Sequence, residues 1–289
     1  MTLRELLNIG TDLLKKQGNE DAVTESELLL CHLLNKDRIY LYAYAREPAD
    51  EDLCQTFFDL LQRRAGGTPL QYILGTVEFM GIPLTVNESV LIPRQDTELL
   101  AEEALKELSK LTRLLRHHQI LDLCTGSGAL AISIAKLDRK ARVTAADLSE
   151  EALEVARKNA AVAGVTDTIH FCQGDLFEAL DGQGPFDLIL SNPPYIATDV
   201  IDTLAVGIRD HEPRMALDGG TDGLDLIRRI LEEAPRHMKP GGLLLMEIGY
   251  DQGNVVRALA LSQKNPFIRA RILRDLNGND RVLKARKAR

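Results

Sequence analysis

The sequence lacks the features of membrane, secreted and metal-binding proteins. Its 289 residues contain no long apolar run of the roughly eighteen residues that a transmembrane helix needs. The first segment is amphipathic and interrupted by charge, unlike a secretion signal, so we expect a cytoplasmic protein without a membrane partner. The four cysteines show no metal-type or disulfide-type spacing, and the histidines are scattered, so we predict no metal site. Only His117 and His118 are adjacent, and we interpret them as a solvated helix end.

Basic residues are also outnumbered by acidic ones. The chain has 35 basic and 43 acidic residues, a formal net charge of −8, which repels nucleic acid unless a local basic patch exists. The clear basic patch is the C-terminal run RVLKARKAR, which we interpret as a solubility feature. We therefore expect no direct nucleic-acid partner. The hydrophobic fraction of 45% is that of a globular chain.

Residues 1–75 carry helical signals throughout. The capping-box pattern occurs at Thr2–Glu5 and again at Thr24–Glu27, each before an apolar run with helical spacing. A third apolar helix is expected after the acidic residues 50–52. The sequence predicts an all-helical N-terminal domain over 1–75, and this domain contains no obvious chemistry of its own.

Residues 76–92 are strand-like and predict a β-hairpin connector, and residues 93–289 then alternate between strand and helix patterns. This alternation predicts an α/β domain with a doubly wound, mostly parallel sheet. Asn277-Gly278 is a strong hairpin signal and predicts an antiparallel edge at the end of the chain. The expected strands are 119–123, 142–146, 169–172, 186–190, 242–248, 268–273 and 281–283, and the expected helices of this domain are 129–137, 149–163, 222–235, 252–262 and one opened by 96–98.

A candidate cofactor site lies at the first strand-to-helix turn of this domain. Gly126 and Gly128 let the backbone turn tightly and approach a ligand, between Thr125 and Ala129. Asp147 closes the next strand, where a carboxylate can accept hydrogen bonds from ribose hydroxyls. The glycine spacing alone does not distinguish a nicotinamide cofactor from S-adenosylmethionine (SAM).

A candidate catalytic corner, Asn192-Pro193-Pro194-Tyr195, follows the fourth strand. The two prolines fix two φ angles, restrict the residue before each of them and offer no backbone N–H donor. The corner is therefore rigid and rich in acceptors. It suits a planar NH₂ group whose two protons are bound while the aromatic ring of Tyr195 covers its face.

Asn192 to Tyr195 resemble the N-P-P-Y signature of SAM-dependent methyltransferases that modify planar amide or exocyclic amino nitrogens. A larger set of motifs is similar to the PrmC/HemK family, which methylates the side-chain nitrogen (N5) of the glutamine in the Gly-Gly-Gln motif of peptide-chain release factors. One departure is Gln95, where that family usually has proline. The motifs that carry the resemblance are 71–75, 78–81, 92–98, 122–128, 192–195, 212–214 and 216–217.

The resemblance implies a Rossmann-like SAM methyltransferase fold and a role for each matching residue. Asp147 should bind the SAM ribose, and Leu176 should pack near the adenine. Asn192 should touch both SAM and substrate. The product would be S-adenosylhomocysteine, without a metal, and the helical domain should help to grip the release factor. The residues implied to line the methionine and ribose are Thr125, Gly126, Ser127, Gly128 and Ala129, and those implied to hold the glutamine amide are Pro193, Pro194 and Tyr195.

Three other functions are compatible with parts of the pattern. A nucleic-acid amino methyltransferase of the N6-adenine type would share the Asn-Pro-Pro-Tyr corner, although the acidic charge argues against it. A nicotinamide dehydrogenase would share the glycine turn, but the sequence offers no clear hydride-transfer site. A non-catalytic binding module would use the helical domain to dock a partner and would fail to bind SAM.

Overall fold

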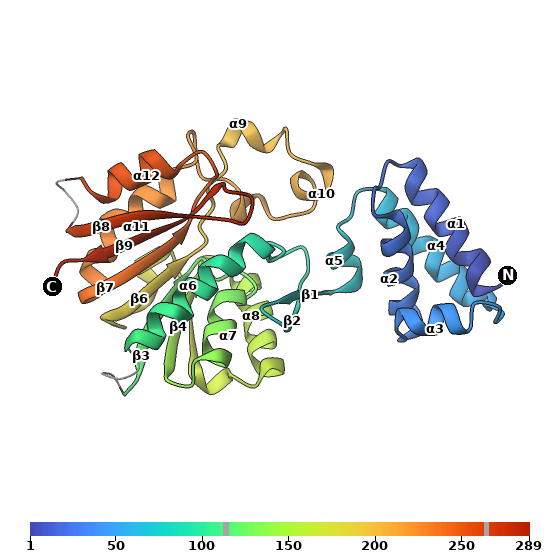
Figure 1. Ribbon diagram of the computed structural model, residues 1–289, viewed down its shortest axis with the longest axis horizontal. Helices are drawn as coiled ribbons and strands as arrows, with labels where there is room; N and C mark the ends of the chain where they lie inside the picture. The colour runs from blue at the N-terminus through green and yellow to red at the C-terminus, as the bar shows by residue number, and fades with distance from the viewer. Residues whose placement is uncertain (112–115, 263–265) are drawn as a thin grey trace. The chain divides into compact units, whose positions relative to one another are not determined.

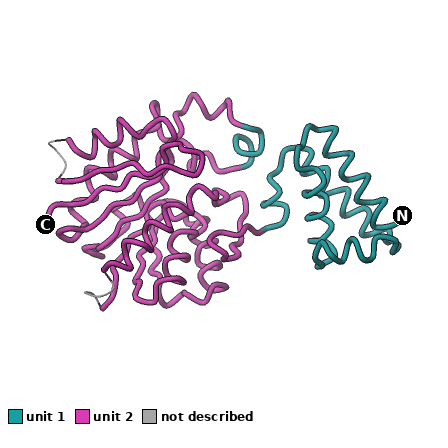
Figure 2. Tube along the Cα trace, in the orientation of Figure 1, with its two compact units in different colours: residues 1–75, 205–211 teal, residues 76–204, 212–289 magenta. Residues whose placement is uncertain are grey.

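The computed structural model describes residues 1–111, 116–262 and 266–289. The chain forms two compact units. The first comprises residues 1–75 together with 205–211, and the second comprises residues 76–204 and 212–289 (Figure 2). The boundary at 75/76 lies where the helical patterns of the sequence give way to strand patterns. The segment 205–211, which groups with the helices, lies far from them in the sequence.

The first unit is a helical bundle around one apolar core (Figure 1). Thr2 caps the first helix in a complete capping box with Glu5, as predicted. Close packing uses Gly10, where a Cβ atom would lie 2.9 Å from the ring of Phe57. The helices of this unit are α1 (Leu3–Lys16), α2 (Ala22–Leu34), α3 (Arg38–Ala43), α4 (Glu51–Ala65), α5 (Leu70–Leu74) and α10 (Val206–Arg209).

The capping box predicted at Thr24 and Glu27 is wrong. Helix α2 already begins at Ala22. Glu27 is buried and forms an ion pair with Arg38, and it also accepts a hydrogen bond from the Tyr42 hydroxyl. Its carboxylate thus joins α2 to α3, a short helix that the sequence pattern did not reveal.

The second unit contains a two-stranded hairpin and, within the described residues, a seven-stranded sheet. The hairpin pairs β1 with β2 and turns at Met80-Gly81, both with positive φ. The strands are β1 (Thr76–Phe79), β2 (Ile82–Thr85), β3 (His118–Leu123), β4 (Ala141–Asp147), β5 (Ile169–Gln173), β6 (Phe186–Ser191), β7 (Met238–Glu247), β8 (Phe267–Arg274) and β9 (Asp280–Lys287). The helices are α6 (Gln95–Leu111), α7 (Ala129–Leu137), α8 (Glu150–Ala163), α9 (Thr198–Ile201), α11 (Asp225–His237) and α12 (Gly253–Ala260), with 3₁₀ turns η1 (Thr166–Thr168), η2 (Leu176–Leu180) and η3 (Arg214–Ala216).

The strand order of the sheet is β5-β4-β3-β6-β7-β9-β8. Strands β3 to β7 are parallel, and β9 pairs antiparallel with both β7 and β8. The chain first winds from β3 outward to β5 and then returns to place β6 on the other side of β3. The predicted doubly wound α/β fold with an antiparallel edge is confirmed. The reversal of strand order lies between β3 and β6, and ligands bind at such points in open α/β sheets.

Each face of the sheet has its own apolar core. Helices α6, α7 and α8 cover one face, together with the hairpin residues Phe79, Ile82 and Leu84 (Figure 1). Helices α11 and α12 and the turn η2 cover the other face. Because both faces are covered, the central strands are buried almost completely, which explains their continuous apolar runs.

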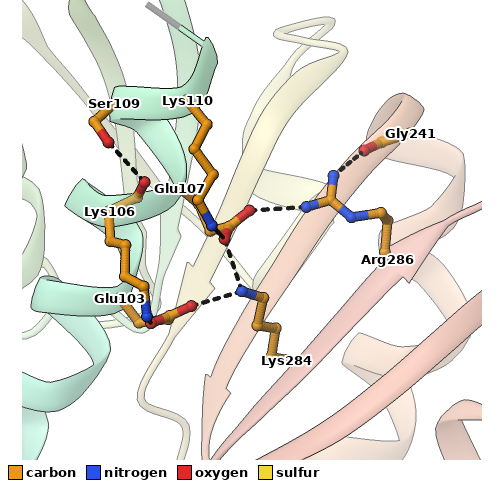
Figure 3. A network of polar contacts seen from close by, with 8 residues as sticks. All are labelled: Glu103, Lys106, Glu107, Ser109, Lys110, Gly241, Lys284 and Arg286. Atoms are coloured by element: carbon orange, nitrogen blue, oxygen red, sulfur yellow. Dashed lines mark hydrogen bonds and ion pairs between the residues drawn. The ribbon is translucent and has the colours of Figure 1, made fainter.

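The basic C-terminal run is part of the sheet rather than a solvated tail, which corrects the interpretation from sequence. Most of it forms β9. Figure 3 shows Lys284 pointing between the carboxylates of Glu103 and Glu107 on α6, at 2.6 and 2.8 Å. Arg286 donates to Glu107 at 2.8 Å and to the carbonyl oxygen of Gly241 at 2.9 Å. Lys284 and Arg286 therefore tie α6 to the sheet.

The adjacent histidines do not form a solvated helix end. His118 begins β3 and is completely buried. Its Nδ1 lies 2.5 Å from a carboxylate oxygen of Asp138, which follows α7. The apolar surroundings of the sheet exclude water from His118, and Asp138 supplies the polar partner that burial requires.

Neither a membrane-spanning helix nor a metal cluster occurs in the described parts of the chain. None of their helices combines the length and the apolar character needed to cross a membrane. Nor do residues 1–111, 116–262 and 266–289 bring together three or more histidine, cysteine, aspartate or glutamate side chains in a way that could hold a metal ion.

Candidate active site

The glycine turn between β3 and α7 is built over a buried carboxylate. Asp122 is fully buried near the end of β3 and accepts hydrogen bonds from the Thr125 hydroxyl at 2.6 Å and the Ala131 N–H at 3.1 Å. Burial raises the pKa of Asp122 to about 7. Gly128 has φ +81, and a Cβ atom there would lie 2.9 Å from Ile132 of α7, so glycine is needed for close packing.

Asp147 stands beside this turn at the end of β4. Its carboxylate accepts one hydrogen bond from the N–H of Gly126 at 2.8 Å and another from the N–H of Ser149 at 3.0 Å. Burial raises the pKa of Asp147, while these backbone donors lower it. A carboxylate oxygen can accept two hydrogen bonds, so each oxygen retains acceptor capacity for a ligand.

A mostly apolar pocket opens at this edge of the sheet and contains about 1030 Å³ of empty space, including the part open to solvent. Its lining combines the glycine turn, the end of β4, the start of η2 and the corner after β6. The volume and the few convergent polar groups are typical of a cofactor or small-molecule site. The predicted residues that line it are Thr125, Gly126, Ser127, Ala129, Asp147, Leu176, Asn192 and Pro194.

Three predicted residues, Gly128, Pro193 and Tyr195, lie outside this lining. Gly128 caps α7 and packs against α8, where a Cβ atom would lie 3.1 Å from Ala156. Pro193 is buried, and Tyr195 packs against the core on the α11 and α12 side of the sheet. Each of the three is next in the sequence to a residue that lines the pocket.

Two non-glycine residues in the lining have unusual backbone conformations. Cys124 has φ +59 and Leu176 has φ +49. Positive φ at such residues costs roughly 1–3 kcal/mol and clusters at functional sites. Burial raises the pKa of the Cys124 thiol, and the Asp147 charge raises it further. The thiol therefore stays protonated and is a poor nucleophile.

The Asn-Pro-Pro-Tyr corner is held by hydrogen bonds at both ends. Ser191, just before it, donates from its hydroxyl to the carbonyl oxygen of Leu123 at 3.0 Å. The Asn192 Nδ2 donates to the Thr97 hydroxyl oxygen at 3.3 Å, and among the described residues no hydrogen bond is made to its Oδ1. Thr97 belongs to the first turn of α6, is buried and lines the same pocket.

Two side chains of the sheet's carboxyl edge hold Tyr195. Its hydroxyl donates to Oε1 of Glu247, at the end of β7, at 3.0 Å. Its carbonyl oxygen accepts from Nε2 of Gln252 at 2.9 Å. Burial raises the pKa of the Tyr195 hydroxyl, and the Glu247 charge raises it further. Tyr195 is thus a neutral anchor with both polar groups satisfied.

The segment after α10 adds a further wall. Pro213, Met215 and Ala216 line the pocket, and Glu212 beside them is buried and forms an ion pair with Arg94. Burial raises the pKa of Glu212, and the Arg94 guanidinium opposes that rise. The ion pair joins the 92–98 and 212–214 motifs.

Sequence reasoning assigned no role to Asp122, Thr97, Glu247 or Gln252. Two of them could have been found from the sequence. Asp122 and Glu247 are isolated acidic residues within apolar strand runs, and a buried acid needs a partner or a function. Thr97 looked like a residue of a helix start. Gln252 looked like a polar residue before α12, and nothing local indicated its contacts.

The geometry defines the class of protein: a doubly wound α/β domain with a cofactor-sized pocket at the carboxyl edge of its sheet. A methyltransferase domain model matches residues 114–276 and a PrmC N-terminal domain model matches residues 5–75. The chain is 41% identical to "Release factor glutamine methyltransferase" of Geobacter sulfurreducens over 99% of this chain and 96% of that protein, and 40% identical to the same-named protein of Moorella thermoacetica over 99% and 98%. It therefore is a methyltransferase and belongs to the release factor glutamine methyltransferase family.

The fold itself also occurs in more distant methyltransferases. The crystal structure of a methyltransferase from Pyrococcus furiosus matches with a TM-score of 0.50 at 20% identity, over 73% of this chain and 91% of that one. At this identity the match bears on the fold alone.

Proposed function

We propose that this protein transfers a methyl group from SAM to the side-chain amide nitrogen of the glutamine in the Gly-Gly-Gln motif of peptide-chain release factors. One observation carries the proposal. The Asn192 corner and the glycine turn beside Asp147 line the same pocket. Two side chains that can accept hydrogen bonds, one proposed to bind the amide N–H and the other the ribose, therefore line one cavity, and this supports the proposal. The family membership supports the choice of a protein glutamine as substrate.

The residues present fit SAM. Asp147 has acceptor capacity left for the ribose hydroxyls, and Gly126 has open space where a Cβ atom would stand, so a ligand can approach the backbone. Apolar Leu176 suits a position beside the adenine ring. We expect Thr125 to Ala129 to surround the methionine part and the ribose. Bound SAM would supply a methyl group on a positively charged sulfur.

The protein's own contribution is positioning. We expect Asn192 to accept one proton of the glutamine amide through Oδ1, because its contact with Thr97 uses Nδ2. Pro193, Pro194 and Tyr195 would hold the rest of the amide through the rigid backbone of the corner. An amide nitrogen is a weak nucleophile, and bound protons favour its pyramidal form. Orientation of this kind supplies roughly 7–11 kcal/mol in favourable intramolecular reactions.

We further propose that the helical unit recognises the release factor in the cytoplasm. The side chains that line the pocket belong to 76–204 and 212–289. Residues 1–75 therefore have no part in the pocket lining and are available for recognition.

A methylation assay tests the proposed function. Purified protein, labelled SAM and intact release factor should give labelled release factor, and a release factor whose Gly-Gly-Gln glutamine is replaced by alanine should give none. Label on nucleic acid instead would favour an amino methyltransferase of the N6-adenine type. Equal labelling of the alanine variant would overturn the glutamine assignment.

A further inference from the structure

Two chain segments hold the Asn-Pro-Pro-Tyr corner, one at each end. At the first end, Nδ2 of Asn192 donates to the Thr97 hydroxyl oxygen at 3.3 Å. At the other end, the N–H of Ile196, the residue after the corner, donates to the carbonyl oxygen of Leu217 at 3.0 Å. The carbonyl oxygen of Ile196 accepts from the N–H of Gly219 at 2.8 Å. The position of the corner therefore depends on where these two segments lie.

An ion pair joins the two segments. The Arg94 carbonyl oxygen accepts from the N–H of Thr97 at 3.1 Å, so Arg94 belongs to the segment that holds Asn192. Glu212 precedes the short turn η3 that leads to Leu217. The Arg94 guanidinium donates to Oε1 of Glu212, whose side chain is 1% exposed. The corner, its two segments and the ion pair thus form a closed ring.

Stability alone does not explain a charged pair at this place. An ion pair with a buried carboxylate often contributes no more to stability than apolar side chains of similar volume, because the charges lose their hydration. The second oxygen of Glu212, Oε2, is buried and has no hydrogen-bond partner within the described residues. What an arginine–carboxylate pair does supply is a directional contact that fixes two groups relative to each other. Both joined segments line the pocket, the first with Pro93 and Thr97 and the second with Pro213 and Met215, so the pair fixes two parts of the pocket wall.

We propose that Arg94 and Glu212 are positioning residues that hold the Asn-Pro-Pro-Tyr corner in its reactive place. The inference rests on the proposed function, in which Oδ1 of Asn192 and the backbone of the corner bind the glutamine amide. Without the ion pair, each segment keeps its own hydrogen bond to the corner, but the two segments can shift relative to each other and displace Asn192. The cofactor end of the pocket has separate contacts, such as that from the N–H of Gly126 to Asp147. Loss of the pair should therefore lower kcat more than SAM affinity.

Three variants test this positioning role. Arg94→Met leaves Glu212 a buried, unpaired charge, and kcat should fall about 100-fold, the cost of a misplacement of about 1 Å at a reacting group. Glu212→Gln still accepts a hydrogen bond from Arg94 but lacks the charge, and kcat should fall about tenfold. The double variant should be faster than Arg94→Met, because no unpaired buried charge remains, whereas independent contributions would multiply to a loss of about 1000-fold. SAM affinity, measured by calorimetry on folded protein, should stay close to that of the wild type in all three.

The ion pair between Lys239 and Asp187 is a matched control. Its carboxylate is also buried and its cation is partly exposed, with 8% and 33% of the two side chains accessible. Asp187 lies near the start of β6, whereas the corner follows the end of that strand. Asp187→Asn should leave kcat on release factor unchanged once folding is verified. An equal loss of kcat in Asp187→Asn and Glu212→Gln would overturn the positioning role, because any buried ion pair would then have the same effect.

Hydrogen exchange gives a readout without substrate. The N–H of Ile196 should exchange faster in Arg94→Met than in the wild type, whereas the N–H of Gly174, which donates to the carbonyl oxygen of Asp147 at 2.9 Å, should exchange equally in both. Equal exchange of Ile196 in the two proteins would overturn the inference. So would a wild-type kcat in folded Arg94→Met, or a double variant slower than Arg94→Met. Labelling of the release-factor glutamine by the wild type tests the proposed function by itself, so the two can fail separately.

Discussion

A Cβ atom at Gly223 would overlap the carbonyl oxygen of Tyr195. The carbonyl oxygen of Gly223 also accepts a hydrogen bond from Gln252, the side chain that holds the same Tyr195 oxygen. Nearby, a Cβ atom at Gly219 would lie 2.8 Å from the Cα atom of Tyr195. The loop before α11 therefore lies directly against the backbone of the Asn-Pro-Pro-Tyr corner, and it can do so only because these positions lack side chains.

Gly223→Ala should displace the corner and lower methyl transfer by about 100-fold, the cost of a misplacement of about 1 Å at a reacting group. Gly164→Ala is the matched control. Both glycines have φ +72, but nothing lies within 4 Å of a Cβ at Gly164. Both variants should lose about 1–2 kcal/mol of stability from left-handed strain. Methyl-transfer rates measured on folded protein distinguish the two variants. An equal effect of both on turnover would show that the contact between Gly223 and the Tyr195 backbone does not matter for catalysis.

Removal of residues 1–75 should leave SAM binding intact and abolish activity on intact release factor. A chain that begins at Thr76 keeps every residue that lines the pocket. It also keeps the segment 205–211 without the helices with which that segment groups. Folding should therefore be checked first by circular dichroism and then SAM affinity by calorimetry. Full activity of this chain on the intact protein would show that the helical unit is not a recognition element.

Asp147→Ala should weaken SAM binding about 10- to 150-fold, which corresponds to the loss of about 1.5–3 kcal/mol of hydrogen bonds to a charged acceptor. Asp147→Asn keeps one acceptor oxygen and should lose less. Asp167→Ala serves as a control because Asp167 is exposed and does not line the pocket. Calorimetry on folded protein is the measurement, and unchanged affinity in Asp147→Ala would remove this residue from the site.

Asp122 should make stability depend on pH. Folding raises its pKa from 3.8 to about 7, so between these values the folded protein holds a proton that the unfolded chain has released. Its contribution to stability is complete below about pH 4 and declines as the pH rises to 7, by at most about 4 kcal/mol. Asparagine at this position does not titrate.

The free energy of unfolding of Asp122→Asn minus that of the wild type should therefore be more positive at pH 8 than at pH 4.5, because the wild type loses stability over this range and the variant does not. Urea unfolding at both values measures this difference. A difference that does not change with pH would show that Asp122 does not titrate in this range.

The fold could be predicted from local patterns, whereas most of the pairings that complete the site could not. Apolar strand runs and intervening helices were sufficient to predict the doubly wound sheet. The contact between Asn192 and Thr97 joins residues 95 positions apart, and that between Tyr195 and Glu247 joins residues 52 apart. Neither pairing leaves a periodic trace in the sequence. The same reason explains why Lys284, whose partners lie on α6, looked like part of a solvated tail.

Asn192→Ala should lower kcat by about 10²–10³ at saturating SAM, by analogy with the removal of one oxyanion-hole donor. The loss of SAM affinity should be smaller, because Asn192 is one of many residues that line the pocket. Turnover on release factor and SAM affinity, measured on the same preparation, separate the two effects. A wild-type rate in Asn192→Ala would show that the corner does not act as proposed.

The kcat of Asn192→Asp should lie between that of Asn192→Ala and that of the wild type. A carboxylate can still accept a proton of the glutamine amide, which alanine cannot. It cannot donate to Thr97, however, so the hydrogen bond that Asn192 donates to the Thr97 hydroxyl is lost. Its negative charge would also favour bound SAM, whose sulfur is positive before transfer and neutral afterwards. We therefore expect tighter SAM binding with slower turnover than the wild type, and a variant slower than Asn192→Ala would show that acceptance of the amide proton is not the role of this side chain.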